Sequence, residues 1–372
     1  MKRICISACL IFINMFCIFS IANAQQPLPC GKYLIDFSAQ DIANNFRRIN
    51  TNQPGTVNYL VRVYFHILQN DDGTNAAITP AQVATEFTTL LSNYAADNLC
   101  FINAGTDNIN NTFLNTLFNA DNDPSGSFFA PYQVPRCINV FYTRKINGNN
   151  SACSPPCGYG GIALGGIPGT FCLVATGNIG PGATISHEVG HCLGLLHCFE
   201  TANGYENING SNSSTAADQV TDTPADPFAY NGSTCYTTPA NSCTYVGTCA
   251  DPNGATAFNP PYTNLMSYWG VRSGCYPTVA NTNGQFLRVN SFLGSSTPLI
   301  NCSSPSILTV FNTTVSSGFY MQSAINSLTT SGNVILNGTV KALVGGGIIN
   351  LEPGFRASPT SGQIRIEVKP CN

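Results

Sequence analysis

Apolar and polar residues alternate over residues 57–68, which is the spacing of a β-strand with one buried face. The apolar face would carry Val57, Tyr59, Val61, Val63, Phe65 and Ile67. The turn sequence Asp71-Asp72-Gly73 follows this predicted strand. His66 lies on the strand, and we expect it to be structural rather than catalytic.

After the turn the residues predict an amphipathic helix. Thr79 is a favourable N-cap, Pro80 suits the first helical position, and Gln82 completes a capping box. The apolar stripe consists of Val83, Phe87, Leu90, Leu91 and Tyr94. We interpret this stripe as a packing face rather than a binding face.

Two further strands are predicted over residues 137–142 and 171–175. The Gly-rich stretch 158–169 between them lacks the Gly-Lys-Ser/Thr ending of a phosphate loop, so we expect it to form a mobile rim of a cleft. A second helix begins near Thr184, and Gly194 can end it in a left-handed turn. Strands and helices together predict an α/β half that ends near this glycine.

The pattern changes again towards the C-terminus. Residues 198–280 are rich in turns and cysteines and have little regular periodicity. From Cys302 onwards, short apolar segments separated by Gly, Pro and Ser predict a small all-β module over residues 302–372. A disulfide between Cys302 and Cys371 would cross-link the two ends of this module. The role of the module could be secretion, stability or surface adhesion. The preceding domain then spans residues 56–298.

The N-terminus reads as a targeting segment. Lys2 and Arg3 precede an almost wholly apolar run over residues 4–21, and the small residues of Ala22-Asn23-Ala24 suit a cleavage site. Residues 1–24 are therefore predicted to be a signal peptide, with an uncleaved membrane anchor as the alternative. Residues 25–55 are polar and are interpreted as a pro-segment or accessory segment.

Low charge with high Gly and Pro content favours a loop-rich, extracellular protein. Only 9% of the residues are charged and the net charge is −3 without a basic run, which argues against nucleic-acid binding. Of the 17 cysteines, Cys5, Cys9 and Cys17 lie in the predicted leader. The others, in an exported protein, predict disulfides rather than zinc fingers.

Three of the four histidines stand in one motif, whose sequence is His187-Glu188-Val-Gly-His191-Cys-Leu-Gly194-Leu-Leu-His197. Residues four apart share one helix face, so the first two histidines can bind one metal ion, and the third can return after the glycine turn. Three nitrogen ligands with an open fourth position predict a catalytic zinc site. Glu188 stands where a carboxylate can take a proton from a zinc-bound water.

A second motif, Asn264-Leu265-Met266-Ser267-Tyr268, lies downstream. Together the two motifs resemble those of the metzincin zinc endopeptidases. The pappalysin family, with its cytophagalysin branch, is indicated by Asp222-Thr223-Pro224, Gly284-Gln285, Arg288, Tyr64-Phe65-His66 and the turn at Asp72-Gly73. The resemblance extends over residues 28–295.

The resemblance implies an α+β catalytic domain with a twisted mixed sheet, a backing helix, an active-site helix and an irregular C-terminal subdomain. Met266 would lie under the zinc as an apolar cushion, and Tyr268 would donate to the oxyanion. It also implies disulfides between Cys235 and Cys249 and between Cys243 and Cys275. Structural calcium is suggested near the cleft, with Asp218 and Asp222 as contributors or else as solvated carboxylates.

Three cysteines near the predicted zinc site leave alternatives open. Cys192 and Cys198 follow the second and third ligands, and they could form an extra disulfide or be small core residues. Cys30, followed by glycine, is similar to the latency cysteine of some zymogens in this group, or it could be part of a plain disulfide. Cleavage near Arg47-Arg48 would release the zymogen.

The sequence therefore predicts a secreted zinc endopeptidase that acts on protein or peptide substrates. We expect no nucleic-acid partner, and no stable membrane insertion after signal removal. The alternatives are a proteolytically silent adhesion module that binds metal and a non-proteolytic zinc hydrolase. An intact Glu188 argues against the silent module, which would not need a general base.

Overall fold

The structure is a computed structural model of the chain. It describes residues 59–97, 99–149, 158–179, 183–230, 235, 245, 247–268 and 280–295, together with Asn333 and the strands between Ser303 and Val368. The predicted leader and pro-segment, with Cys30, Cys243, Cys275, Cys302 and Cys371, lie outside the described residues. The predicted domain boundaries stay predictions.

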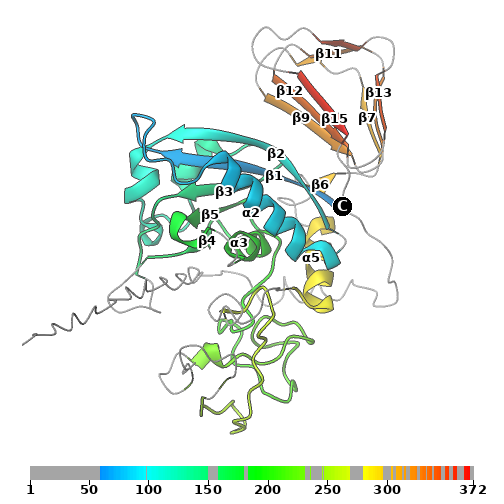
Figure 1. The fold of residues 1–372 in the computed structure, drawn as a ribbon. Helices are drawn as coiled ribbons and strands as arrows, with labels where there is room; N and C mark the ends of the chain where they lie inside the picture. The colour runs from blue at the N-terminus through cyan, green and yellow to red at the C-terminus, as the bar shows by residue number, and fades with distance from the viewer. Residues whose placement is uncertain are drawn as a thin grey trace, which may run out of the picture.

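A mixed sheet forms the centre of the fold (Figure 1). Its strands are β1 (Tyr59–Gln69), β2 (Leu99–Asn110), β3 (Ile138–Thr143), β4 (Gly161–Ala163) and β5 (Phe171–Ala175), in the order β2-β1-β3-β5-β4. All neighbours are parallel except β4, which runs antiparallel at the edge of this order. A short strand β6 (Ser303–Ser304) also pairs with β1.

Three strand predictions are confirmed and two strands were missed. Strands β1, β3 and β5 correspond to the predicted segments. Strand β2 escaped prediction because it contains Asn103, Gly105 and Asp107, residue types that are rare in strands. It forms because β1 pairs with it along its whole length. The Gly-rich stretch contributes the edge strand β4, which its composition did not indicate.

Both faces of the sheet are buried. Alternate strand residues such as Val140 and Tyr142 pack with helices α2 (Pro80–Asn93) and α3 (Thr184–Cys192) on one face. The intervening Phe141 packs on the other face, beneath short helical turns that contain Leu114 and Phe129. Helix α2 begins with the predicted capping box at Thr79 and Gln82. Parallel strands buried in this way form the rigid support for α3.

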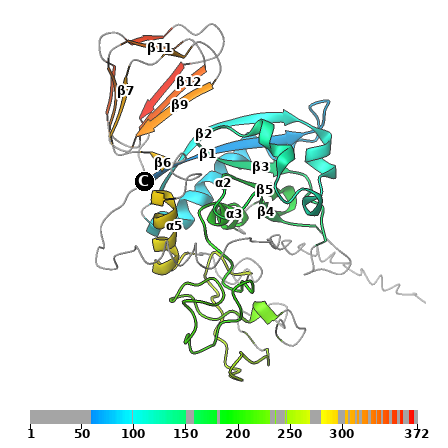
Figure 2. The ribbon, with the colours of Figure 1, turned by 180° about the vertical axis from the view of Figure 1, so that it is seen from behind.

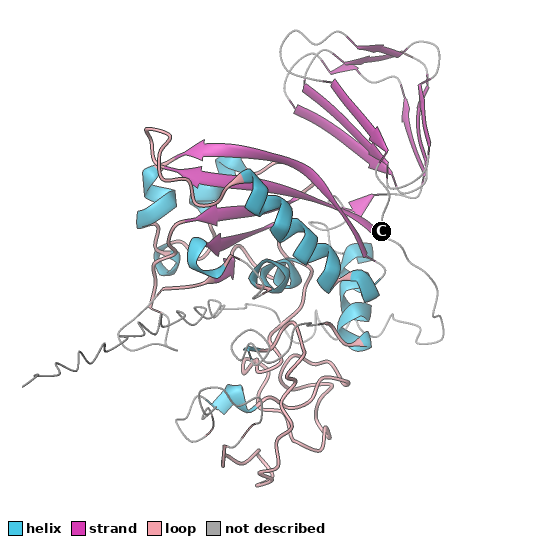
Figure 3. Cartoon of the chain, in the orientation of Figure 1, coloured by secondary structure: helices cyan, strands magenta, loops and turns pink. Residues whose placement is uncertain are grey.

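The chain after α3 is irregular, as its lack of periodicity predicted. Between residues 193 and 267, the described part contains one short 3-10 helix, η6 (Pro227–Tyr230), and no strand longer than an isolated bridge. Figure 3 shows this region as loops below the sheet. Helix α5 (Asn283–Ser295) then packs beside α3, with its Val289 and Leu293 in the main core.

Every described element from Ser303 onwards is a strand. The chain coils through these strands in three successive turns. The third turn contains β13 (Ile348–Leu351), β14 (Phe355–Ala357) and β15 (Ile364–Val368). The earlier turns contribute β7 (Ile307–Phe311), β8 (Thr314–Val315), β9 (Phe319–Ala324), β10 (Ser327–Ser331), β11 (Val334–Leu336) and β12 (Thr339–Val344). They form three parallel three-stranded sheets, each with one strand from every turn (Figure 2).

This arrangement is a three-sided parallel β-helix. Ser327 pairs with Ile307 on one side and Ile348 on the other, so the chain advances by about 20 residues per turn, at the short end of known repeat lengths. The prediction of short strands did not include this repeat. A search for self-similarity at a fixed spacing could have found it.

Candidate metal centre

Helix α3 presents two histidines, and a left-handed turn brings back the third. Gly194 has φ +94°, a conformation that favours glycine. Its N–H donates to His191 O, and the N–H of Leu195 donates to Gly190 O, both at 2.9 Å. These two bonds form a Schellman motif, which ends the helix and reverses the chain towards His197. The predicted helix end at Gly194 is confirmed.

The same turn orients the second histidine. Nδ1 of His191 lies 2.8 Å from Leu195 O, and Nδ1 of His187 lies 2.7 Å from Leu265 O. Because a carbonyl oxygen only accepts, each Nδ1 must carry the proton. The Nε2 atoms of these neutral rings are therefore lone-pair acceptors.

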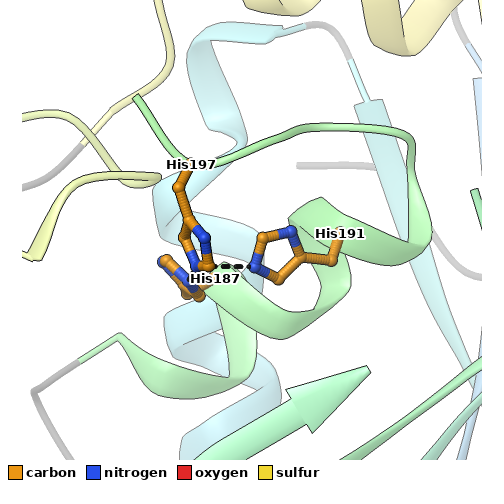
Figure 4. Close-up of side chains that lie close together, drawn as sticks. All are labelled: His187, His191 and His197. Atoms are coloured by element: carbon orange, nitrogen blue, oxygen red, sulfur yellow. Dashed lines mark hydrogen bonds between the residues drawn. The ribbon is translucent and has the colours of Figure 1, made fainter. Parts of the chain in front are cut away.

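These acceptors converge on the third histidine (Figure 4). His197 Nε2 lies 3.1 Å from His191 Nε2 and 3.2 Å from His187 Nε2, and all three rings are buried. A proton on His197 Nε2 would make these contacts hydrogen bonds, whereas in a neutral ring without that proton the lone pairs would face one another, as they do around a bound cation. In a tetrahedral zinc site with Zn–N bonds of about 2.0–2.1 Å, ligand nitrogens stand about 3.3 Å apart. The donor set therefore fits zinc.

Burial keeps the imidazoles in the neutral form that a metal requires. It lowers the pKa of His187 to about 4, against a smaller opposing effect of the hydrogen bond to Leu265. Burial also lowers the pKa of His191, and the neighbouring His187 adds to the shift. Neither ring therefore needs to lose a proton to bind a metal ion near neutral pH.

Glu188 is fully buried and follows His187 directly in the chain. Its carboxylate packs against Gly161 of the edge strand, where an added Cβ would overlap Oε1, Cγ and Cδ of the glutamate. Sequence reasoning found Glu188 but not Gly161. A glycine in a short edge strand marks a close approach, and here it makes room for the carboxylate.

The methionine turn lies directly beneath α3. Met266 is fully buried, and an added Cβ on Gly190 would meet its sulfur at 2.7 Å and the hydroxyl of Tyr94 at 3.0 Å. Tyr94 OH also donates to the carbonyl of Ser186, next to the first ligand, at 2.9 Å. Met266 therefore packs under helix α3. Tyr94, predicted only as a packing residue, also supports this helix.

Tyr268 stands beside the histidine cluster. Its ring centroid lies 5.8 Å from that of His187 and 5.2 Å from that of His197, and its side chain is 6% exposed. It packs with Phe199 and Phe228, and the first of these stacks on His197 at 4.5 Å. The structure thus brings Tyr268 together with the histidine cluster.

The cysteines that follow His191 and His197 are buried thiols in this structure. Cys192 packs in the main core. The sulfur of Cys198 instead donates to Asn264 Oδ1 at 3.2 Å. The structure thus places both as small buried residues, without the extra disulfide between them. Cys235 and Cys249 are also unbridged, but their side chains are hydrogen-bonded to each other.

The two aspartates suggested for calcium have different surroundings. Asp222 accepts from Thr282 Oγ1 at 2.6 Å and from Gly284 N at 2.9 Å, so its carboxylate caps helix α5. Asp218 is buried, and Oδ1 accepts from Val220 N and Thr223 Oγ1. Among the described residues, the group of His, Cys, Asp and Glu side chains arranged to hold a metal is the histidine cluster. Calcium has no support from this geometry.

His66 has the structural role that the strand position predicted. It is fully buried, with Nδ1 2.7 Å from Asp107 Oδ1 and Nε2 3.0 Å from Asn139 Oδ1. Its ring stacks on Phe141. These contacts belong to the sheet and not to the metal centre.

A known protease has a similar sequence. The chain is 27% identical over 276 residues to an extracellular metalloprotease from Podospora anserina, and the match spans 68% of this chain and 80% of that protein. No protein-family model matches the chain. The similarity and the histidine cluster together support a metalloprotease. In the part of the chain that the structure describes, no helix has the length and apolar character of a membrane span.

Proposed function

We propose that the protein is a secreted zinc endopeptidase with a metzincin catalytic domain of the pappalysin type. The observation that carries this proposal is the convergence of the Nε2 atoms of His187, His191 and His197 beside the buried Glu188. The similarity to an extracellular metalloprotease supports both the reaction and the location. The domain boundaries at 56–298 and 302–372 and the leader at 1–24 belong to the same proposal.

The three histidines would hold the zinc ion. When bound, zinc lowers the pKa of a water molecule and polarises the substrate carbonyl. Glu188 would accept the proton of the attacking water at a carboxylate oxygen and deliver it to the nitrogen of the leaving amine. The hydroxyl of Tyr268 would donate a hydrogen bond to the carbonyl oxygen as negative charge develops on it.

The edge strand supports a polypeptide as the substrate. Strand β4 pairs with β5 through one edge, and its Gly161 contacts the carboxylate of Glu188. An extended peptide that adds to the outer edge would gain backbone hydrogen bonds that do not depend on its side chains. This mode of binding would place a peptide bond next to the general base.

The proposal also includes a latent precursor and a disulfide near the catalytic domain's irregular region. Cys30 would hold the fourth coordination position in the precursor, and cleavage near Arg47-Arg48 would release it. The contact between Cys235 and Cys249 supports a bridge between them in the exported, oxidised protein.

Cleavage of a proteome-derived peptide library tests the proposed function. Glu188→Gln should retain zinc but lose cleavage by several orders of magnitude, because the neutral amide cannot accept the proton. Glu200→Gln is the matched control, since Glu200 is also buried and its Oε1 accepts from the backbone N–H groups of Thr201 and Ala202. Unchanged cleavage by the Glu188 variant would exclude the proposed mechanism.

A further inference from the structure

Helix α5 carries a glutamine that contacts the methionine turn. The helix starts with a capping box, in which Gln285 N donates to Thr282 Oγ1 at 3.2 Å and Thr282 N donates to Gln285 Oε1 at 3.0 Å. Gln285 is fully buried. Asp222 holds the same helix start through Thr282 and Gly284. The side chain of Gln285 therefore has a fixed position.

The amide of Gln285 pairs with that of Asn264. Asn264 Nδ2 donates to Gln285 Oε1 at 2.7 Å, and Gln285 Nε2 donates to Asn264 Oδ1 at 3.2 Å. Both amide orientations follow from backbone donors. Thr282 N–H needs an oxygen on Gln285, and Met266 N–H, at 2.8 Å, needs an oxygen on Asn264.

Asn264 in turn holds two segments that carry zinc ligands. Its bond to Met266 N closes the turn in which Leu265 O accepts from His187 Nδ1. Cys198, next to the third ligand, donates its thiol to Asn264 Oδ1 at 3.2 Å and its N–H to Met266 O at 3.2 Å. Gln285 Nε2 also reaches this sulfur, at 3.8 Å.

We propose that Gln285 is a positioning residue for the metal centre, which acts by holding the side chain of Asn264 in the methionine turn. The inference rests on the proposed function, because it takes the three histidines as zinc ligands. The loss of Gln285 should affect the positions of the three histidines unequally. His187 and His197 depend on the turn, whereas His191 is oriented by Leu195 within its own Schellman motif.

The test compares Gln285→Met with Gln82→Met in the processed protein, which keeps every residue after the pro-segment. Gln82 is the capping-box glutamine of α2; it is exposed and bonds to Thr79. Both variants lose a capping box, but only the first loses the amide pair. Zinc affinity is measured by competition with a chromogenic chelator, and ligand geometry by the visible spectrum of the cobalt(II)-substituted protein.

Gln285→Met should weaken zinc binding by about 10–100-fold, the usual effect of losing a residue that orients a metal ligand, and should shift the cobalt spectrum. Gln82→Met should change neither. If Gln285→Met does not fold, Gln285→Glu replaces it. The ionised glutamate, measured at a pH above its pKa, keeps the two acceptor contacts but cannot donate to Asn264 Oδ1, so it should also weaken zinc binding.

A variant that folds with the zinc affinity and cobalt spectrum of the wild type would overturn the positioning role, whatever its peptidase activity. A wild-type protein that binds zinc but cleaves no peptide would overturn the proposed function alone. The altered zinc affinity of Gln285→Met would then still support the positioning role. The two failures are therefore distinguishable.

Discussion

Nδ1 of His187 donates to the backbone carbonyl of Leu265 at 2.7 Å, although the two residues are 78 positions apart in the chain. This bond sets the tautomer of the ligand and directs Nε2 towards the other histidines. The methionine turn therefore orients His187, a proposed zinc ligand, through its backbone, and Met266 packs under Gly190. Helix α3 and the turn form one unit.

Gly190→Ala tests this unit. The added methyl group would meet the Met266 sulfur and the Tyr94 hydroxyl in a fully packed site, so we expect a loss of about 1–3 kcal/mol in the free energy of unfolding, together with weaker zinc binding. Denaturant unfolding and chelator competition measure the two effects. Gly177→Ala is the control, because its Cβ would meet no atom within 4 Å. Equal stabilities of the two variants would contradict the packing argument.

Gly161→Ala tests the space for the general base. The methyl group would overlap the Glu188 carboxylate, which must then move away from the attacking water. We expect kcat to fall on the order of 100-fold, within the range that general bases contribute, while zinc content stays complete. Steady-state kinetics and metal analysis provide the measurements. A kcat equal to that of Gly177→Ala would show that Gly161 does not set the position of Glu188.

The convergence of the three histidines could be predicted from the sequence because the residues belong to one local motif. His187, His191 and His197 need only helical spacing and one glycine turn to meet. The supporting residues could not be found in this way. Gly161 acts by having no side chain, and Leu265 acts through its backbone carbonyl. Such contacts depend on how distant segments pack.

The elements of the fold divide in the same way, into those with a local sequence signal and those that depend on distant contacts. The alternating residues of β1 and the capping box of α2 gave correct elements, because their signals are local. Strand β2 was missed because its polar residues hide the strand pattern, and its pairing with β1 depends on a distant segment. Helix α5 was also missed, although Thr282 and Gln285 have the spacing of a capping box. Its apolar stripe is short, so the capping residues were the better signal.

Tyr268→Phe tests the proposed oxyanion donor. The ring would keep its packing with Phe199 and Phe228, so folding and zinc binding should be unchanged. If the hydroxyl acts mainly in the transition state, kcat should fall by about 10²–10³-fold with little change in KM. Steady-state kinetics on a defined peptide measures both constants. An unaltered kcat would leave Tyr268 with a packing role only.

Glu206→Gln should make the protein more stable at alkaline pH. Burial, with added repulsion from Asp218 and Asp226, raises the pKa of Glu206 to about 8 from an ordinary value of 4.5. The folded protein therefore keeps a proton that the unfolded chain releases, so stability is fully present below pH 4.5 and falls as the pH rises towards 8. Glutamine removes this loss. Melting temperatures from pH 5 to 9 should diverge in favour of the variant at the alkaline end.

The control for this prediction is Glu200→Gln, which changes a buried glutamate of the same irregular region. Its melting curve should follow that of the wild type. A gain in alkaline stability equal to that of Glu206→Gln would contradict the assignment of the stability loss to Glu206.

The same series tests the calcium suggested by the family resemblance. A cation bound by these carboxylates would favour their charged forms and restore alkaline stability to the wild type. Since the described residues place no calcium site there, added calcium should leave the difference between wild type and Glu206→Gln unchanged.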